Sequence, residues 1–163
     1  MSVVESDGAD GMASIYLAGP VFTDAETAWL RRLKSELVNT WGSDVTVIWP
    51  FEATPKDSDN RAAEVLRICR EGLDSADILI ASLDGPQVDD GTAWEIGYFF
   101  YAKGGDARII GIRTDVRCAG ETAGIPVNTL IGASCGVIVK DTTELLNYLP
   151  KSGLLAYSSG EQP

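Results

Sequence analysis

The acidic residues of this sequence are the first candidates for chemistry. Glu95 lies in the strongly apolar segment TAWEIGYFFYA, in which Tyr98 and Phe99 follow at i+3 and i+4 on the same helical face. A carboxylate among aromatic side chains is costly unless it has hydrogen-bond partners or a chemical task. Glu95 is therefore either rotated to solvent, satisfied by a backbone amide of the first helical turn, or a reactive group.

A second acidic cluster, Asp89-Asp90-Gly91-Thr92, directly precedes this segment. Asp90 or Thr92 is expected to cap the following helix by accepting hydrogen bonds from its free amides. Capping does not require two adjacent aspartates, and like charges side by side favour a bound hydroxyl that takes up one of them. The cluster predicts a helix start and a place for a polyol or hydroxyl.

Three residues near the N-terminus have both a structural and a functional interpretation. Tyr16 is either a packing residue of a strand or a hydroxyl aimed at a ligand. Gly19 with Pro20 forms a turn, which would also allow a ligand to approach closely. Phe22 either stacks on a planar base or packs as the hydrophobic residue before a helix cap at Thr23.

Composition excludes several classes of function. The 163 residues contain 13 Lys and Arg against 24 Asp and Glu, a net charge of −11 that argues against nucleic acid or an anionic membrane as partner. The absence of histidine excludes His-dependent triads, His general bases and His-ligated metals. Neither GxGxxG after a strand nor GxxxxGK[ST] occurs, so nucleotide-phosphate motifs are lacking. We expect no metal and no cofactor.

The length and the apolar content fit one folded domain. No apolar run approaches the ~20 residues that span a bilayer, and the N-terminus lacks the features of a secretory signal. The three cysteines form no CxxC pair and predict reduced thiols in a cytoplasmic protein. We expect a flexible N-terminus at residues 1–12, a folded domain at 13–150 and a tail at 151–163.

Short β-rich runs alternate with helical patterns along this domain. A T-x-x-E capping box at Thr23 and Glu26 predicts the start of the first helix. A further capping pattern, Asp141 with Glu144, predicts the last one. Strands are expected at 14–18, 45–49, 77–83, 108–112 and 135–139, other helices at 61–73 and 92–103, and a long loop at 113–130.

Strands that alternate with helices predict a parallel sheet with right-handed crossovers. Five strands favour a three-layer, doubly wound α/β fold of the flavodoxin-like type, with strand order 2-1-3-4-5. The loops AGPVFTD and LDGPQVDDG, which follow the first and third strands, would then meet at the carboxyl edge of the sheet. A site is expected there.

Three separated segments carry a resemblance to a known family. IYLAGPVFTD at 15–24, ADILIASLDGPQVDDGTAWEIGYFFYAKG at 76–104 and GIPVNTL at 124–130 occur in the right order on the expected elements. Together they resemble the nucleoside 2-deoxyribosyltransferase family, and the RTD triplet at 113–115 also recurs among its members. The combination covers most of the folded domain and is far more specific than any one segment.

The resemblance implies a mechanism and a set of catalytic residues. Glu95 would be the nucleophile that forms a covalent 2-deoxyribosyl ester, from which a second base takes the sugar with net retention. Tyr16 would orient this nucleophile, and Asp89 would hold the sugar 5′-hydroxyl. Asn128 would reach the site of a neighbouring subunit, which implies a homo-oligomer with shared active sites. The further substrate-binding residues expected are Gly19, Phe22, Glu52, Cys69, Asp90, Asn128 and Leu130.

The sequence departs from the family pattern at three places. Cys69 stands where the family usually has an aspartate that helps to protonate the base, so this task would fall to Glu52 or Asp74. The loop PFEATPKD lacks the usual amide-bearing pattern that reads the base. Leu130 replaces a methionine, which is a conservative packing change.

Three functions remain open. The first is transfer of deoxyribose between free bases, and the second is hydrolysis of the N-glycosidic bond of nucleosides or nucleoside 5′-monophosphates. A sibling branch of the family, which this chain also resembles, hydrolyses nucleoside monophosphates and carries a serine where Asp89 stands. A carboxylate there should repel a phosphate dianion, so we expect free nucleosides and free bases as partners. The third is a nucleoside-binding domain without catalysis.

Overall fold

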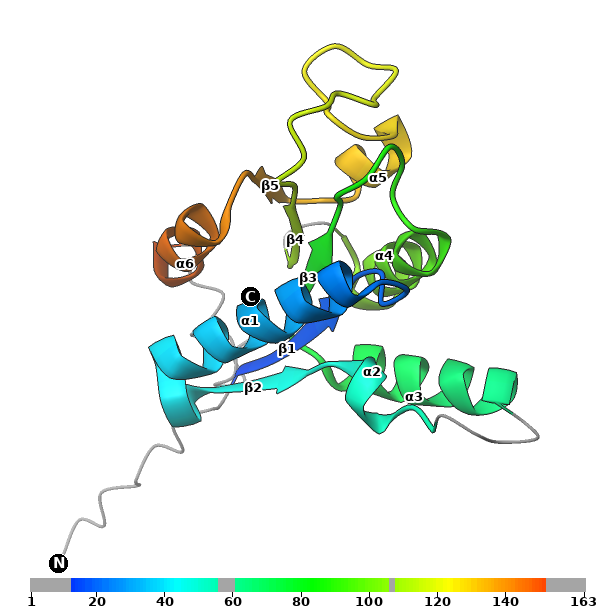
Figure 1. Ribbon diagram of the computed structural model, residues 1–163, viewed down its shortest axis with the longest axis vertical. Helices are drawn as coiled ribbons and strands as arrows, with labels where there is room; N and C mark the ends of the chain where they lie inside the picture. The colour runs from blue at the N-terminus through cyan, green and yellow to red at the C-terminus, as the bar shows by residue number, and fades with distance from the viewer. Residues whose placement is uncertain (1–12, 56–60, 106–107, 152–163) are drawn as a thin grey trace, which may run out of the picture.

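The computed structural model describes residues 13–55, 61–105 and 108–151. Five strands and their connecting helices follow one another in the order expected for an α/β fold (Figure 1). The strands are β1 Ala13–Ala18, β2 Val45–Ile48, β3 Ile78–Ser82, β4 Ile109–Ile112 and β5 Val137–Val139. The helices are α1 Asp24–Trp41, the short 3-10 turn η1 Gly42–Asp44, α2 Pro50–Ala53, α3 Arg61–Ser75, α4 Asp90–Lys103, α5 Thr129–Ala133 and α6 Thr142–Lys151.

All strand pairs are parallel, and the order is β2-β1-β3-β4-β5. Tyr16 on the central strand β1 is paired with Ile48 on β2 and with Leu79 on β3. The predicted flavodoxin-like class and strand order are confirmed. The strand order changes direction at β1 and β3, so the loops after these two strands lie at the same edge of the sheet.

Helices cover both faces of the sheet. On one face, α1 and α6 contribute Leu30, Leu33 and Leu145 to a core that also holds Ile15 and Leu17 of β1. On the other, α3 and α4 contribute residues to a second core that holds Tyr16 and Ala18 of β1. Successive β1 side chains alternate between the faces because a strand has a side-chain period of two. Tyr16 therefore points toward α3 and α4.

The two helix starts nearest the site differ in how well the sequence predicted them. At α1 the capping box is present, because Thr23 Oγ1 accepts from the Glu26 amide at 3.2 Å and Glu26 Oε2 accepts from the Thr23 amide at 2.8 Å. At α4 the prediction that Asp90 or Thr92 caps the helix was wrong. The N-cap is Asp89, whose Oδ2 accepts from the Thr92 amide at 2.9 Å. Asp89 has the non-helical ψ of 139° and lies three residues before that amide, as a cap requires.

Two short helices were not predicted. α2 lies in a segment expected as a polar loop, and α5 begins within and extends beyond the loop expected at 113–130. Helices of four and five residues are too short to show an apolar period. The predicted N-terminus at 1–12 and, beyond the end of α6, the predicted tail lie outside the described residues. None of the helices in the described part of the chain is long and apolar enough to cross a membrane.

Candidate active site

Glu95 and Tyr16 are joined by a short hydrogen bond between α4 and β1. The Tyr16 hydroxyl donates to Glu95 Oε1 at 2.5 Å, and the tyrosine has no solvent-exposed surface. The ring packs against Gly72 of α3, where an added Cβ would lie only 2.9 Å from Tyr16 Cε2. Tyr16 is thus a packing residue and a partner of the carboxylate at once. The Tyr16 hydroxyl provides the hydrogen-bond partner that the Glu95 carboxylate needs, so neither rotation to solvent nor a first-turn amide has to be invoked.

Burial determines the ionisation of this pair. Burial is the largest of the causes that together raise the pKa of Glu95 to about 7. The hydrogen bond from Tyr16 and the nearby Cys69 thiol favour the charged form and oppose this increase, whereas the negative charge of Asp89 adds to it. Burial, followed by the nearby Glu95 charge, raises the pKa of Tyr16 far above its usual range, so its hydroxyl stays a donor.

A cavity of about 410 Å³ lies next to Glu95. It is formed by the loop after β1, the segment after β2, and α3 with α4. The sequence-predicted residues that line it are Gly19, Phe22, Cys69 and Glu95, and its other lining residues are Leu17, Ala18, Val21, Trp49, Pro50, Phe51, Thr54, Arg61 and Val65. The cavity has aromatic walls and a partly ionised carboxylate, an arrangement that suits a flat ring joined to an electrophilic carbon.

The aromatic wall has a fixed part and an exposed part. Trp49 and Phe51 lie with ring centroids 4.9 Å apart, and Trp49 is buried in the core of the α1 face. Phe22 is 79% exposed, so it is available to a ligand and does not pack as the apolar residue before the α1 cap. The exposed ring is compatible with the interpretation of Phe22 as a residue that stacks on a planar base.

Asp89 lies close enough for its charge to act on Glu95, but its carboxylate has a structural task too. Asp89 Oδ2 accepts from both the amide and the hydroxyl of Thr92. Asp90, the first residue of α4, is exposed. Of the acidic pair, only Asp89 has an electrostatic effect on Glu95.

Four acidic candidates lie outside the lining of this cavity: Asp89 and Asp90 at the start of α4, Glu52 and Asp74. Glu52 is exposed on α2 and forms an ion pair with Lys34. Asp74 is exposed near the end of α3 and accepts a hydrogen bond from the Tyr98 hydroxyl at 2.7 Å. Within the described residues, Glu95 is the one carboxylate among the side chains that line the cavity.

Asn128 and Leu130 line a different and larger cavity, of about 730 Å³. Asn128 caps α5, since its Oδ1 accepts from the amides of Leu130 and Ile131 at 3.0 and 3.4 Å. Its amide donates to Glu121 at 3.1 Å, and Leu130 is 78% exposed. A single chain does not bring either residue into the lining of the Glu95 cavity.

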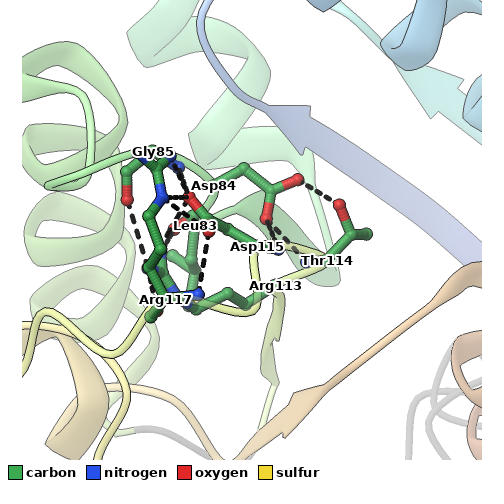
Figure 2. Close-up of polar contacts among 7 residues, drawn as sticks. All are labelled: Leu83, Asp84, Gly85, Arg113, Thr114, Asp115 and Arg117. Carbon is green, nitrogen blue, oxygen red and sulfur yellow. Dashed lines mark hydrogen bonds and ion pairs between the residues drawn. The ribbon is translucent and has the colours of Figure 1, made fainter.

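A network at the same edge of the sheet escaped the sequence interpretation (Figure 2). The buried Arg113 guanidinium donates to the carbonyls of Leu83, Gly85 and Arg117. It ties the loop after β3, which leads to Asp89, to the loop after β4. An arginine directly after a buried strand is the signal that could have found it, because such a cation needs several acceptors.

Asp84 and Asp115 complete this network. Asp84 accepts from the amide and the hydroxyl of Thr114, each at 2.6 Å, and from the Asp115 amide at 2.8 Å. The hydrogen bond from Arg117 is the main reason why the pKa of Asp115 lies well below its usual range. In the described residues, no group of three or more Cys, Asp or Glu side chains gathers as a metal site requires.

Comparison with known proteins shows the family. A family model described as nucleoside 2-deoxyribosyltransferase matches residues 15–147, which is most of the chain. The chain belongs to the nucleoside 2-deoxyribosyltransferase family. The matched residues include most of β1, the loop before α4 and the α5 cap, and so include every candidate site residue. Among curated proteins, none matches this chain.

Solved structures of the nucleoside 2-deoxyribosyltransferase family and of related proteins share the fold. A conserved protein from Enterococcus faecalis is 25% identical with a TM-score of 0.70, over 86% of this chain and 98% of that one. A 2-deoxyribosyltransferase from Bacillus psychrosaccharolyticus is 23% identical with a TM-score of 0.65, over 83% and 92%. A CMP N-glycosidase from Clostridium botulinum is 18% identical with a TM-score of 0.52, over 85% and 98%.

Proposed function

We propose that this protein is a nucleoside 2-deoxyribosyltransferase, which exchanges the base of 2′-deoxynucleosides through a covalent deoxyribosyl ester of Glu95. The observation that carries the proposal is the Tyr16–Glu95 hydrogen bond beside a cavity with aromatic walls. The half-buried Glu95 carboxylate, with a pKa of about 7, is ionised in a substantial fraction of molecules at neutral pH. Such a group has the charge and the position of a nucleophile.

The reaction has two displacements. A Glu95 oxygen attacks the anomeric carbon, the carbon–oxygen bond forms, and the N-glycosidic bond breaks with its electron pair going to the base, which takes up a proton from solvent. A second base then attacks the same carbon and releases a proton to solvent, and Glu95 leaves as the carboxylate, so the sugar configuration is retained. Tyr16 orients the nucleophile and keeps its proton throughout, because its pKa lies far above neutrality.

Substrate contacts follow from the lining of the cavity and from its neighbours. The base lies against Phe22, Trp49 and Phe51. Asp89 accepts a hydrogen bond from the sugar 5′-hydroxyl, which a 5′-phosphate could not offer in its dianionic form. The proposed substrates are therefore free deoxynucleosides and free bases.

A neighbouring copy completes the site in this proposal by contributing Asn128. Two observations support an oligomer. Asn128 does not line the Glu95 cavity of its own chain. The outer face of α4 presents Trp94 and Tyr101, which are 46% and 88% exposed, although a helix apolar on all sides is normally covered.

The function is tested by incubating the protein with deoxythymidine and free adenine and following the products by chromatography. The expected product is deoxyadenosine. Free deoxyribose without deoxyadenosine would instead support the hydrolase, and binding without turnover would support a nucleoside-binding domain. The similarity to a CMP N-glycosidase makes hydrolysis the second candidate, so deoxycytidine 5′-monophosphate is included as a parallel substrate.

Glu95→Gln tests the nucleophile. Gln keeps the size and the acceptor for Tyr16 but cannot form the ester, so the rate should fall by about 10³-fold or more while the protein stays folded. The tyrosine partner gives a matched variant, because Tyr16→Phe keeps the ring and should lose only about 10–100-fold. Near-normal turnover by Glu95→Gln, with its mass verified, would rule out the mechanism.

A further inference from the structure

A cation of α3 lies in the lining of the Glu95 cavity. Arg61, Val65 and Cys69 follow one another at intervals of four residues and line the cavity from one face of this helix. Arg61 is the first residue of α3, and it is exposed. In the part of the chain that the structure describes, Arg61 is the one cation among the lining side chains, as Glu95 is the one carboxylate.

The cation and the nucleophile lie apart along the cavity. Arg61 and Cys69 are more than two helical turns from each other, about 12 Å along the axis of α3. Besides burial, the groups that shift the pKa of Glu95 are Tyr16, Cys69 and Asp89, and Arg61 is not one of them. The positive charge of Arg61 is therefore placed to act on a bound molecule and not on the nucleophile.

A departing base needs stabilisation, because the electron pair of the broken bond leaves negative charge on its ring. Either an acid that protonates the base or a cation beside it can provide this. The carboxylates Glu52 and Asp74 lie outside the lining of the cavity. Within the lining, the Thr54 hydroxyl donates to the Pro50 carbonyl at 2.9 Å, and burial raises the pKa of the Cys69 thiol, which makes it a weaker acid. The lining thus offers a cation for this task.

We propose that Arg61 is a further catalytic residue, whose guanidinium contacts the departing base and stabilises it as an anion. This inference rests on the proposed function, in which Glu95 is the nucleophile. A Glu95 oxygen forms its bond to the anomeric carbon, the N-glycosidic bond breaks, and the electron pair of that bond stays on the base. The anion is paired with Arg61 until it leaves the cavity and takes up a proton from solvent.

This role defines a class of donor substrate. Uracil and thymine carry two ring carbonyls, which share the negative charge of the departing base and accept from the guanidinium, a group with donors only. Cytosine has one carbonyl and an amino group, and an arginine cannot accept from that amino group. The donors expected are therefore deoxynucleosides of dioxopyrimidines, deoxyuridine and deoxythymidine, in preference to deoxycytidine.

Arg61→Met tests the role, because methionine keeps much of the length of the side chain without its charge. With adenine as the acceptor, kcat/KM should fall about 10–100-fold for deoxythymidine and less than about 3-fold for deoxycytidine. The loss for 5-fluorodeoxyuridine should be intermediate, because fluorine helps the base to hold negative charge and reduces its need for the cation. Equal losses for the three donors would overturn the proposal, since a structural defect does not distinguish between leaving groups.

Two variants of α3 are the controls. Arg61→Lys keeps a cation and should lose less activity on deoxythymidine than Arg61→Met. Arg67 forms ion pairs with Glu64 and Glu71 and does not line the cavity, so Arg67→Met should leave kcat/KM for each donor within about 2-fold of the wild type. A loss in Arg67→Met as large as that in Arg61→Met would overturn the proposal, because the charge of the helix and not a contact with the base would be responsible.

A binding measurement tests the contact without turnover. In Glu95→Gln, which lacks the nucleophile, bound 5-fluorouracil is titrated by ¹⁹F NMR. The titratable neighbours Tyr16, Cys69 and Asp89 are unchanged when Arg61→Met is added to this variant. The pKa of the bound base should be lower than that of the free base in water, and the added substitution should raise it by about 1 unit, because a cation favours the anion.

The two measurements separate this inference from the proposed function. If the wild type shows no turnover but Arg61→Met raises the pKa of bound 5-fluorouracil, the proposed function fails and the contact between Arg61 and the base stands. An unchanged pKa of the bound base, or no binding of 5-fluorouracil, would overturn the inference even in a protein that transfers deoxyribose.

Discussion

At the scale of single residues, Glu95 is held at a balance between opposing effects. Burial among apolar side chains disfavours its charge, whereas the hydrogen bond from Tyr16 and the nearby Cys69 thiol favour it. The outcome is a carboxylate with a pKa of about 7, whose charged form is more costly in the folded chain than in the unfolded one. Such a group contributes to function at the expense of stability.

The stability of Glu95→Gln relative to the wild type should therefore depend on pH. Folding raises the pKa of Glu95 from 4.5 to about 7. Between these pH values the folded wild type binds more protons than the unfolded chain, so it loses stability as the pH rises. Gln does not titrate. The variant should be more stable by on the order of 2 kcal/mol at pH 8 and nearly equal to the wild type at pH 4.

Chemical denaturation at both pH values measures this difference. Asp90→Asn, which neutralises an exposed carboxylate of the same helix, is the control and should change stability little at either pH. Equal stability of Glu95→Gln and the wild type at pH 8 would contradict the raised pKa.

In the proposed reaction, we expect Asp89 to determine which sugar substituent is accepted. Asp89→Ser should lower activity on free deoxynucleosides and improve the relative use of 5′-monophosphates, because a group that repels the dianion becomes a donor. Serine also caps helices well, so α4 should keep its start. The ratio of kcat/KM for deoxycytidine 5′-monophosphate to that for deoxycytidine is expected to rise about 10-fold or more. A wild type that already prefers monophosphates would contradict this role for Asp89.

At the scale of elements, the site depends on two loops held by one buried cation. Arg113 follows β4 directly and donates to carbonyls of the loop after β3, and Asp84 of that loop accepts from two amides of the loop after β4 (Figure 2). Loops carry few regular backbone hydrogen bonds of their own, so they need such side-chain partners to hold one conformation. The loop after β3 then delivers Asp89 to the start of α4.

Arg113→Met tests this element. The side chain keeps much of its length and apolar volume, but three carbonyls lose their donor in a buried position. The free energy of unfolding should fall by about 3 kcal/mol, and KM should rise as Asp89 loses its position. Arg117→Met, which removes an exposed cation from the same loop, should cost less than about 1 kcal/mol. Equal losses for the two variants would contradict the structural role of Arg113.

At the scale of the whole molecule, the residues expected around one substrate do not all lie at one cavity. Tyr16, Cys69 and Glu95 are brought together by the sheet and its helices, whereas Asn128 lines the larger cavity and caps α5. A two-fold assembly, in which each site takes Glu95 from one chain and Asn128 from the other, would unite them.

Mixing two inactive variants tests the shared site. Glu95→Ala and Asn128→Ser should each be nearly inactive, and serine preserves the α5 cap so that local unfolding does not confuse the result. After subunit exchange, about half of the dimers are mixed, and each has one site with both defects and one with neither, so about a quarter of wild-type activity should return. Exchange is verified by native mass spectrometry, and the unmixed variants are the controls. No recovery after verified exchange would show that each chain forms its site alone.

The sequence by itself determined the fold class of this protein and named its candidate site residues. Alternating strands and helices predicted the sheet order, because crossover handedness leaves few topologies, and the T-x-x-E box located the start of α1. Glu95 was predicted as a candidate from a purely local signal, because a carboxylate is unusual inside an apolar helix. Such signals are readable because they depend on residues a few positions apart.

Contacts between distant segments were decided only by the tertiary structure. The choice of Asp89 as cap depends on the backbone conformation that the preceding loop adopts, and the burial of Arg113 depends on carbonyls some thirty residues away. Tyr16 and Glu95 lie 79 residues apart in the chain, and their side chains are in contact because Tyr16 points to the face of the sheet that α4 covers. Residue types and local spacing indicate what chemistry each side chain can perform. The partner of a side chain, its burial and hence its pKa are set only when the fold brings distant segments together and excludes water from between them.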